Sequence, residues 1–146
     1  MIDATGSGAM DLVLMQSGPQ AVRVLHRLQN GSFEELDAQT MGLKAAGPAV
    51  ACAVGDFNGD GLNDLAVATD DALLLFRNLG HGKFEDVTAA SGLAPRNRPS
   101  GITFLDYDHD GDLDLFLTGS PLKSPTAQAT ARPAAFKPIA CASSSS

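Results

Sequence analysis

The sequence predicts an all-β chain built from repeated, antiparallel four-stranded units, and three observations support this. An aspartate-rich loop at residues 56–64 recurs 50 residues later, at 106–114. Apolar runs of four to eight residues, bounded by Gly, Asn and Asp, flank the loops, as is typical of strands joined by turns. The similarity between the copies also extends beyond the loops. A period of this length indicates a solenoid, a propeller or an array.

Composition narrows the class of protein. The 146 residues are 44% hydrophobic, which is enough for one domain with a core. A net charge of −7 and a pI near 4.6 argue against a nucleic-acid partner, which needs a basic face. No apolar stretch approaches the length of a membrane span, so we expect no membrane insertion. The first residues have neither the charged nor the apolar segment of a signal peptide, so none is expected in this chain.

The two loops have the spacing of a calcium site. Each places side-chain oxygens at positions 1, 3, 5 and 9 and a glycine at position 6. Calcium takes about six to eight oxygen ligands, and the chain must curl around the ion to supply them. An EF-hand loop would require Glu at position 12, where Val67 and Leu117 stand instead. The spacing therefore predicts calcium loops between strands. Magnesium, which keeps several waters, is the weaker candidate.

The first unit, near residues 3–48, begins with a degenerate copy of the loop. Counting back from Asp11 gives Asp3, Thr5 and Ser7 at positions 1, 3 and 5. Two carboxylates are present, against three in the second loop and four in the third. We therefore expect this first site to be weak or empty.

The rest of the first unit also resembles the second. A strand is expected at 11–15, directly after the loop. The segment that begins at Arg27 resembles the one that begins at Arg77, and Asn30-Gly31 is a hairpin turn signal.

The second unit, near residues 49–98, carries the content of one β-propeller blade. A connector at 89–101 should lead to the next unit, because its prolines forbid a central strand. Strands are expected at 49–54, 65–68, 72–77 and 83–88.

The third unit, 99–119, stops after its first half. Residues 120–146 are rich in Pro, Ala, Ser and Thr without strand alternation, so we expect a disordered tail. The repeat region is thus predicted at 1–119, as an incomplete propeller of about two and a half units. Such a fragment exposes strand edges. We therefore expect self-association or pairing with missing blades.

Aromatic residues flank the second and third loops. Phe57, Phe104 and Tyr107 stand where strands end. Aromatic residues at such places are expected to join the core rather than to form a stacking platform for a ligand.

The loop pattern Asp-x-Asp/Asn-x-Asp-Gly-x-x-Asp resembles the FG-GAP/VCBS repeat of calcium-binding propellers, including integrin α-subunit heads. Residues 75–93 are in addition similar to a signature of the ASPIC/UnbV group, which includes cartilage acidic protein-like proteins. The resemblance covers residues 3 to about 119. It implies ligation by the side chains of Asp56, Asn58, Asp60 and Asp64 with the Leu62 carbonyl, and of Asp106, Asp108, Asp110 and Asp114 with the Asp112 carbonyl.

The same resemblance implies a function. We expect a calcium-binding structural or adhesive module of a secreted or cell-surface protein, with a protein or glycan ligand and without enzymatic activity. The alternative is a non-catalytic fragment of a propeller-containing enzyme of the lyase or hydrolase class, because such repeats also occur beside catalytic domains.

Overall fold

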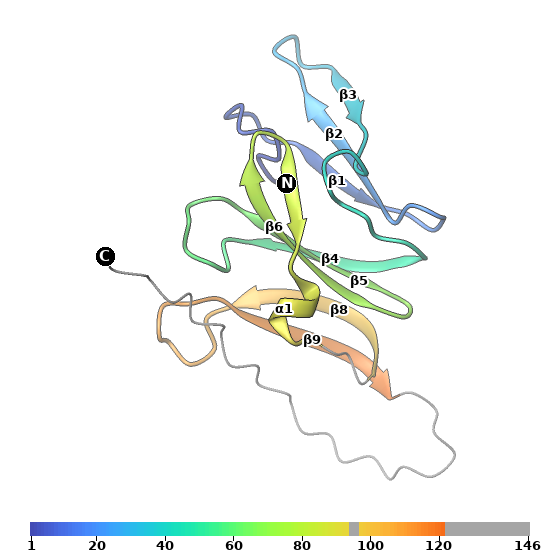
Figure 1. Ribbon diagram of the computed structural model, residues 1–146, viewed down its shortest axis with the longest axis vertical. Helices are drawn as coiled ribbons and strands as arrows, with labels where there is room; N and C mark the ends of the chain where they lie inside the picture. Colours follow the sequence, from blue (N-terminus) through green and yellow to red (C-terminus); the bar gives the residue numbers. More distant parts are fainter. Residues whose placement is uncertain (94–96, 122–146) are drawn as a thin grey trace.

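The computed structural model describes residues 1–93 and 97–121, which form three antiparallel sheets (Figure 1). The predicted all-β, antiparallel class is confirmed, while closure into a propeller stays a prediction. The first sheet contains β1 (Leu12–Met15), β2 (Val22–Arg27) and β3 (Phe33–Leu36); the second contains β4 (Ala49–Gly55), β5 (Asp64–Thr69), β6 (Leu73–Gly80) and β7 (Lys83–Asp86); the third pairs β8 (Asn97–Leu105) with β9 (Asp114–Pro121).

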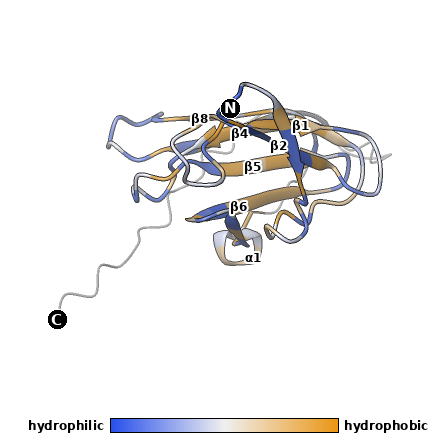
Figure 2. Cartoon of the chain, turned by 90° about the horizontal axis from the view of Figure 1, so that it is seen from above, coloured by the Kyte–Doolittle hydropathy of each residue, from blue (hydrophilic) through white to orange (hydrophobic). Residues whose placement is uncertain are grey.

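The second sheet is a complete four-stranded unit, with its strands hydrogen-bonded in chain order from β4 to β7. Its strand β5 is buried along its whole length, with β4 and β6 paired to its two edges. Figure 2 shows these strands as mainly hydrophobic and the connecting loops as mainly hydrophilic. The other two sheets contain only some of these four strands.

Each of the two outer sheets is part of a further copy of this unit. In the first, a single bridge between Ile2 and Asp11 stands where β4 pairs with β5 in the second sheet. The third sheet contains the counterparts of β4 and β5. The described residues thus present the last three strands of one unit, a whole unit, and the first two strands of another.

The connector differs from its prediction. The four-residue helix α1 (Thr88–Ser91) follows β7, and β8 begins at Asn97, so the expected strandless segment 89–101 is wrong at its end. Pro99 fits into β8 because the register with β9 shifts between Pro99 and Gly101, and proline is tolerated at bulges and edges. No helix in the described part of the chain is long and apolar enough to cross a membrane.

The third unit extends further than expected. Strand β9 runs to Pro121, beyond the predicted end of the repeat region at 119. The rest of the expected tail, 122–146, lies outside the described residues.

The main hydrophobic core joins the first two sheets. The connection between β3 and β4 contributes to it, since Met41, Leu43 and Ala45 are buried there. Backbone hydrogen bonds hold this connection to both sheets, from Phe84 N to Met41 O (2.7 Å) and from Ala21 N to Ala45 O (2.7 Å). The two units are therefore joined both by burial and by main-chain bonds.

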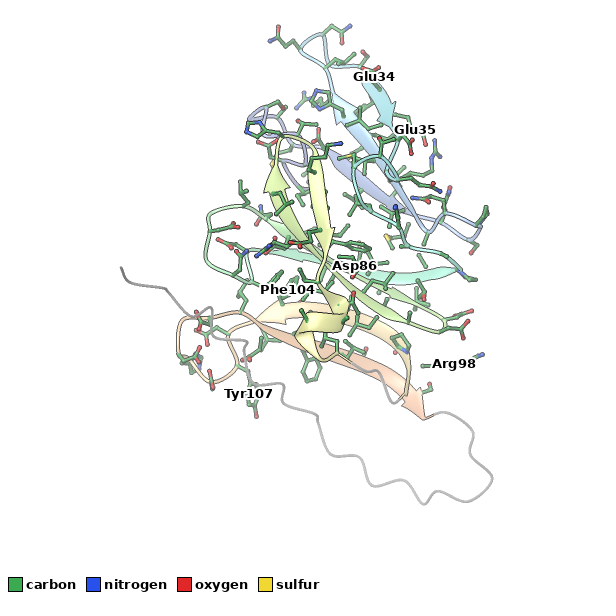
Figure 3. All side chains as sticks on the ribbon, in the orientation of Figure 1. Glu34, Glu35, Asp86, Arg98, Phe104 and Tyr107 are labelled. Atoms are coloured by element: carbon green, nitrogen blue, oxygen red, sulfur yellow. The ribbon has the colours of Figure 1, made fainter. Side chains whose placement is uncertain are left out.

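A second interface joins the second and third sheets. The rings of Phe57 and Phe104 stack with centroids 6.4 Å apart, and the side chains of Phe104 and Leu113 lie against Gly55. The two phenylalanines are packed, as expected. The expectation is wrong for Tyr107, which is 66% exposed and points outward from its loop (Figure 3).

Gly42 lies at the contact between the first two units, so a substitution there measures how much this contact stabilises the fold. Its φ is +96°, and a Cβ there would overlap the carbonyl oxygen of Phe84. We predict that Gly42→Ala lowers the free energy of unfolding by about 2–4 kcal/mol through strain and steric overlap, as measured by urea denaturation.

Gly47→Ala is the matched control for that prediction. Gly47 lies in the same connection with a similar φ of +89°, but apart from its two chain neighbours no described residue has an atom within 4 Å of an added Cβ. The control therefore carries the backbone strain without the overlap and should cost about 1 kcal/mol. Equal losses in the two variants would contradict the prediction.

Candidate metal centres

The aspartate at position 9 closes each of the three loops in the same way. Its carboxylate accepts a hydrogen bond from the backbone N–H of the residue at position 2, seven residues earlier. Asp11 and Asp64 are completely buried in this role. The three bonds join Ala4 N to Asp11 (3.0 Å), Phe57 N to Asp64 (3.1 Å) and Tyr107 N to Asp114 (3.0 Å).

In the first two loops the same carboxylate also holds the strand that follows the next turn. Asp64 Oδ1 accepts from Asn78 N on β6 (2.7 Å), and Asp11 Oδ1 accepts from Arg27 N on β2 (3.3 Å). Arg27 is therefore the structural counterpart of Asn78. The correspondence of Arg27 with Arg77, expected from the sequence, is wrong by one residue.

Burial changes the acidity of Asp64. It raises the pKa of this carboxyl to about 6. The N–H groups of Asn78 and Phe57 lower the pKa, because they stabilise the charged form, whereas the nearby carboxylates of Asp60 and Asp56 raise it. A cation beside this carboxylate would offset the cost of keeping it ionised.

The third loop has the geometry that best fits a cation. Asp106, Asp108 and Asp114 each place a carboxylate oxygen within 4.8 Å of the others. Asp106 Oδ2 accepts from Gly111 N (3.2 Å), but Asp106 Oδ1 is buried without a hydrogen-bond partner among the described residues. A buried, unpaired carboxylate oxygen is costly. The residues present therefore fit a divalent cation, which would supply the missing partner.

The other predicted ligands of the third loop lie at the turn. Asp110 Oδ1 accepts from the backbone N–H of Asp112 (2.9 Å), which tightens the chain after Gly111. His109, at position 4, is exposed and adopts a positive φ of 60°. Asp110 and Asp112 are also exposed and lie outside the group of three converging carboxylates.

The second loop is held by its own N–H groups. Asp56 accepts from the backbone of Asp60 (3.1 Å) and of Gly61 (2.8 Å), and Asp60 accepts from Leu62 N (2.8 Å). The Asn58 amide donates to Asp60 Oδ2 (2.9 Å). With three carboxylates and one amide, this loop offers less negative charge to a cation than the third loop does.

The first loop satisfies its carboxylates without a cation. The buried Asp11 has a further partner in His26, whose Nδ1 lies 2.8 Å from Asp11 Oδ1. His26 was not identified from the sequence. The sequence offered one signal for such a partner: the first loop has Asp11 at position 9 although positions 3 and 5 are Thr5 and Ser7. The Asp3 carboxylate accepts three backbone N–H groups, from Gly6 (2.8 Å), Ser7 (3.1 Å) and Gly8 (2.8 Å).

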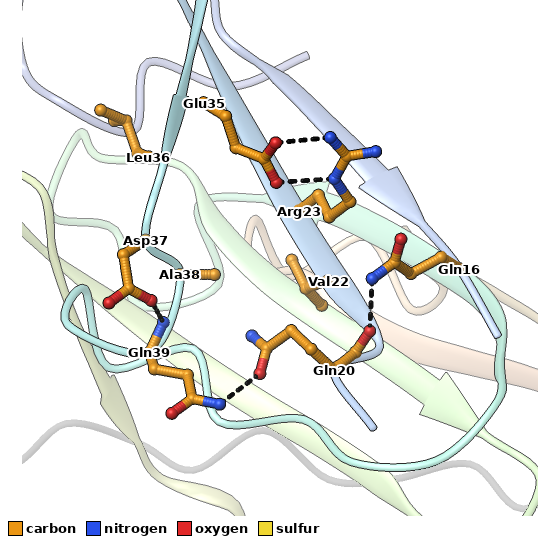
Figure 4. A pocket seen from close by; sticks show the side chains of 9 residues that line it. All are labelled: Gln16, Gln20, Val22, Arg23, Glu35, Leu36, Asp37, Ala38 and Gln39. Atoms are coloured by element: carbon orange, nitrogen blue, oxygen red, sulfur yellow. Dashed lines mark hydrogen bonds and ion pairs between the residues drawn. The ribbon is translucent and has the colours of Figure 1, made fainter. Parts of the chain in front are cut away.

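A separate polar hollow of about 250 Å³ lies at the other end of β1 from the first loop (Figure 4). Many of its polar groups are paired with one another. Arg23 and Glu35 form a two-bond ion pair, and Gln39 donates to Gln20 Oε1 (3.0 Å). Gln20 in turn donates to Leu43 O (3.1 Å). We interpret these groups as structural contacts that tie β2 to β3 and to the connection that follows.

His26 should stabilise the first unit independently of calcium. We predict that His26→Ala lowers the free energy of unfolding by about 1–3 kcal/mol, because the buried Asp11 loses a partner. Urea denaturation should show the same loss in calcium and in chelator. His26→Asn keeps an N–H donor and should recover part of the stability. A loss that calcium abolishes would mean that the first loop also binds an ion.

The comparison with known families agrees with this repeated architecture. The FG-GAP-like repeat matches the chain twice, over residues 3–67 and over residues 56–117. A search of curated proteins found no match. Each family match includes two of the three loops, and together the matches cover most of the chain. The chain is therefore a member of the FG-GAP-like repeat family.

Proposed function

We propose that this chain is a calcium-stabilised repeat module in which ions support the loop that precedes the second strand of a unit. The observation that carries the proposal is the third loop. There three carboxylates converge, and one of their oxygens is buried without a partner in the part of the chain that the structure describes. We also propose that the chain is related to the ASPIC/UnbV group and to integrin α-subunit heads, as the resemblance of its sequence implies.

Calcium is the ion that suits these donors. Carboxylate, amide and carbonyl oxygens favour hard cations, whereas zinc prefers Cys and His. Two carboxylates about 4 Å apart repel by about 4 kcal/mol at an effective dielectric constant near 20, before screening. An ion bound by the folded loop would remove that repulsion and stabilise the folded state by mass action.

The three loops should differ in affinity. The third should bind most tightly, because it carries the most negative charge. The first should bind most weakly or not at all, because it has two carboxylates and one of them, Asp11, is already paired with the His26 side chain. The proposed ligands are Asp106, Asp108, Asp110 and Asp114 with the Asp112 carbonyl in the third loop, and Asp56, Asn58, Asp60 and Asp64 with the Leu62 carbonyl in the second.

We propose that the module binds a protein or glycan ligand outside the cell and does not catalyse a reaction. Extracellular calcium modules work with dissociation constants of about 0.1–1 mM, so even modest sites suit that setting. The carboxylates that acid–base chemistry would need are accounted for here as ligands and loop anchors. The alternative is a non-catalytic fragment of a propeller-containing enzyme, and lyase or hydrolase activity of the parent protein on ester or polysaccharide substrates would favour it.

The edge of β9 supports the proposed pairing with another chain or with further blades. In the complete unit, β6 pairs with β5 and covers it. The corresponding edge of β9 has no partner strand within residues 1–93 and 97–121, and Phe116 on β9 is 40% exposed. An unpaired strand edge is a template for another strand.

Calcium should raise the melting temperature and give two binding events. At a free concentration about 100 times Kd, one site contributes about 2.7 kcal/mol to stability. Calorimetric titration and thermal melting, each compared with excess chelator, measure this. Asp108→Ala should abolish the tighter site and Asp60→Ala the weaker one.

Two further variants sharpen that experiment. Asp108→Asn gives the third loop the amide that the second has at Asn58, so its affinity should fall toward that of the second loop. Asp71→Ala, which removes an exposed carboxylate outside the loops, should leave both sites unchanged. Absence of any calcium response in the unaltered chain would refute the metal assignment.

Self-association should depend on β9. Phe116→Lys places a charge on this strand and should reduce the association of the chain, as measured by sedimentation velocity over a range of concentrations. Leu79→Lys is the control, because Leu79 is 51% exposed on β6, whose two edges are paired. Equal effects of the two variants, or a monomeric unaltered chain, would argue against pairing through β9.

A further inference from the structure

We propose that Asn30 is an acceptor for N-linked glycosylation. Asn30-Gly31-Ser32 has the pattern Asn-x-Ser with a residue other than proline in the middle, which is the acceptor pattern for this modification. The chain contains five asparagines, and Asn30 is the one that stands two residues before a Ser or Thr. The pattern is only three residues long, so Asn30 must also be accessible in the folded chain to act as an acceptor.

The pattern lies at the tip of the hairpin between β2 and β3. Hydrogen bonds from Leu28 N to Ser32 O (2.9 Å) and from Gly31 N to Leu28 O (2.9 Å) close the turn. Asn30, Gly31 and Ser32 are all exposed. Figure 1 shows this tip at the far end of the first sheet, away from the other two sheets. A large group attached here would not displace any core residue.

The side chain of Asn30 is held in a defined orientation. Its Oδ1 accepts from Ser32 N (2.9 Å) and from Ser32 Oγ (2.7 Å). Both bonds use the carbonyl oxygen of the amide and neither uses Nδ2, the atom that would receive the sugar. The serine of the pattern is therefore already paired with the asparagine that it would help to present.

The reaction is a group transfer from a polyprenyl-diphosphate-linked oligosaccharide. Asn30 Nδ2 forms a bond to the anomeric carbon of the first sugar, and the bond from that carbon to the diphosphate oxygen breaks. The polyprenyl diphosphate leaves with the electron pair, and Nδ2 gives up one proton to the transferase. No group is oxidised or reduced.

The second unit contains a buried asparagine with the same local hydrogen bond, Asn78 in strand β6. Gly80 N donates to Asn78 Oδ1 (2.9 Å), as Ser32 N does to Asn30, but Asn78 is buried and its Nδ2 donates to Asn63 O (3.0 Å). Gly80→Ser, at a position where φ is +73°, would therefore place the acceptor pattern on an asparagine that makes the same local hydrogen bond as Asn30 but is buried in a strand. The chain thus supplies its own control for accessibility.

The occurrence of the modification in a cell rests on the proposed extracellular setting, whereas the ability of Asn30 to accept a glycan does not. The purified, folded chain is incubated with a purified oligosaccharyltransferase and a polyprenyl-diphosphate oligosaccharide, and intact mass and peptide mapping locate the product. We expect one glycan, on Asn30. Asn30→Gln, Ser32→Ala and Gly31→Pro should each abolish it, while Gly80→Ser should add none on Asn78.

Several outcomes would overturn the proposal. One is a folded chain that stays unmodified while a peptide of residues 27–34 is modified; another is that neither is modified. Transfer to Asn78 in the folded Gly80→Ser variant would show that burial does not select the site, once urea denaturation confirms that the variant folds. The calcium response is measured separately, so failure of either proposal leaves the other intact.

Discussion

The carboxylate at position 9 of each loop is the constraint on which the rest of the structure depends. Asp64 links the start of its own loop, through Phe57, to strand β6 of the same sheet, through Asn78. A carboxylate can do this because it has two oxygens and accepts from several donors at once. Burial of Asp64 would be costly without such partners, so loop and strand are coupled: neither can move away without leaving a buried charge unsatisfied.

The three loops satisfy this aspartate in different ways. In the first, His26 and backbone N–H groups surround Asp11. In the second, N–H groups from β6 and from the loop surround Asp64. In the third, Asp114 lies among other carboxylates and accepts from the backbone of Tyr107. We infer that the need for an ion grows along the chain, because the carboxylates at positions 1, 3, 5 and 9 rise from two in the first loop to three in the second and four in the third.

Contacts between units add a second level of organisation. Phe84 of the second unit meets the connection that leaves the first, through the close backbone approach at Gly42. Phe104 of the third unit stacks on Phe57, at the base of the second loop. Each unit is therefore completed by its neighbour, as expected when a repeat cannot bury its hydrophobic surface alone.

Much of the architecture could be predicted from local patterns. The four strands of the second unit and the turn around Gly80 follow from apolar runs between residues that favour turns. Errors arose where tertiary contacts decide. Pro99 was expected to exclude a strand, but a bulge accommodates it. Tyr107 was expected to be packed like Phe57, but the ring that packs on Phe57 comes from Phe104.

The sequence by itself determined the class of structure, the repeat and the positions of the loops, because each depends on the order and spacing of residues along the chain. Only the tertiary structure decided which oxygens converge and which are already paired. It separated Asp106, with one oxygen unpaired among the described residues, from Asp3, which accepts three N–H groups. It also placed His26 against Asp11. Those relations depend on strand register and burial, and a shift of one residue in register changes which side chain meets the loop.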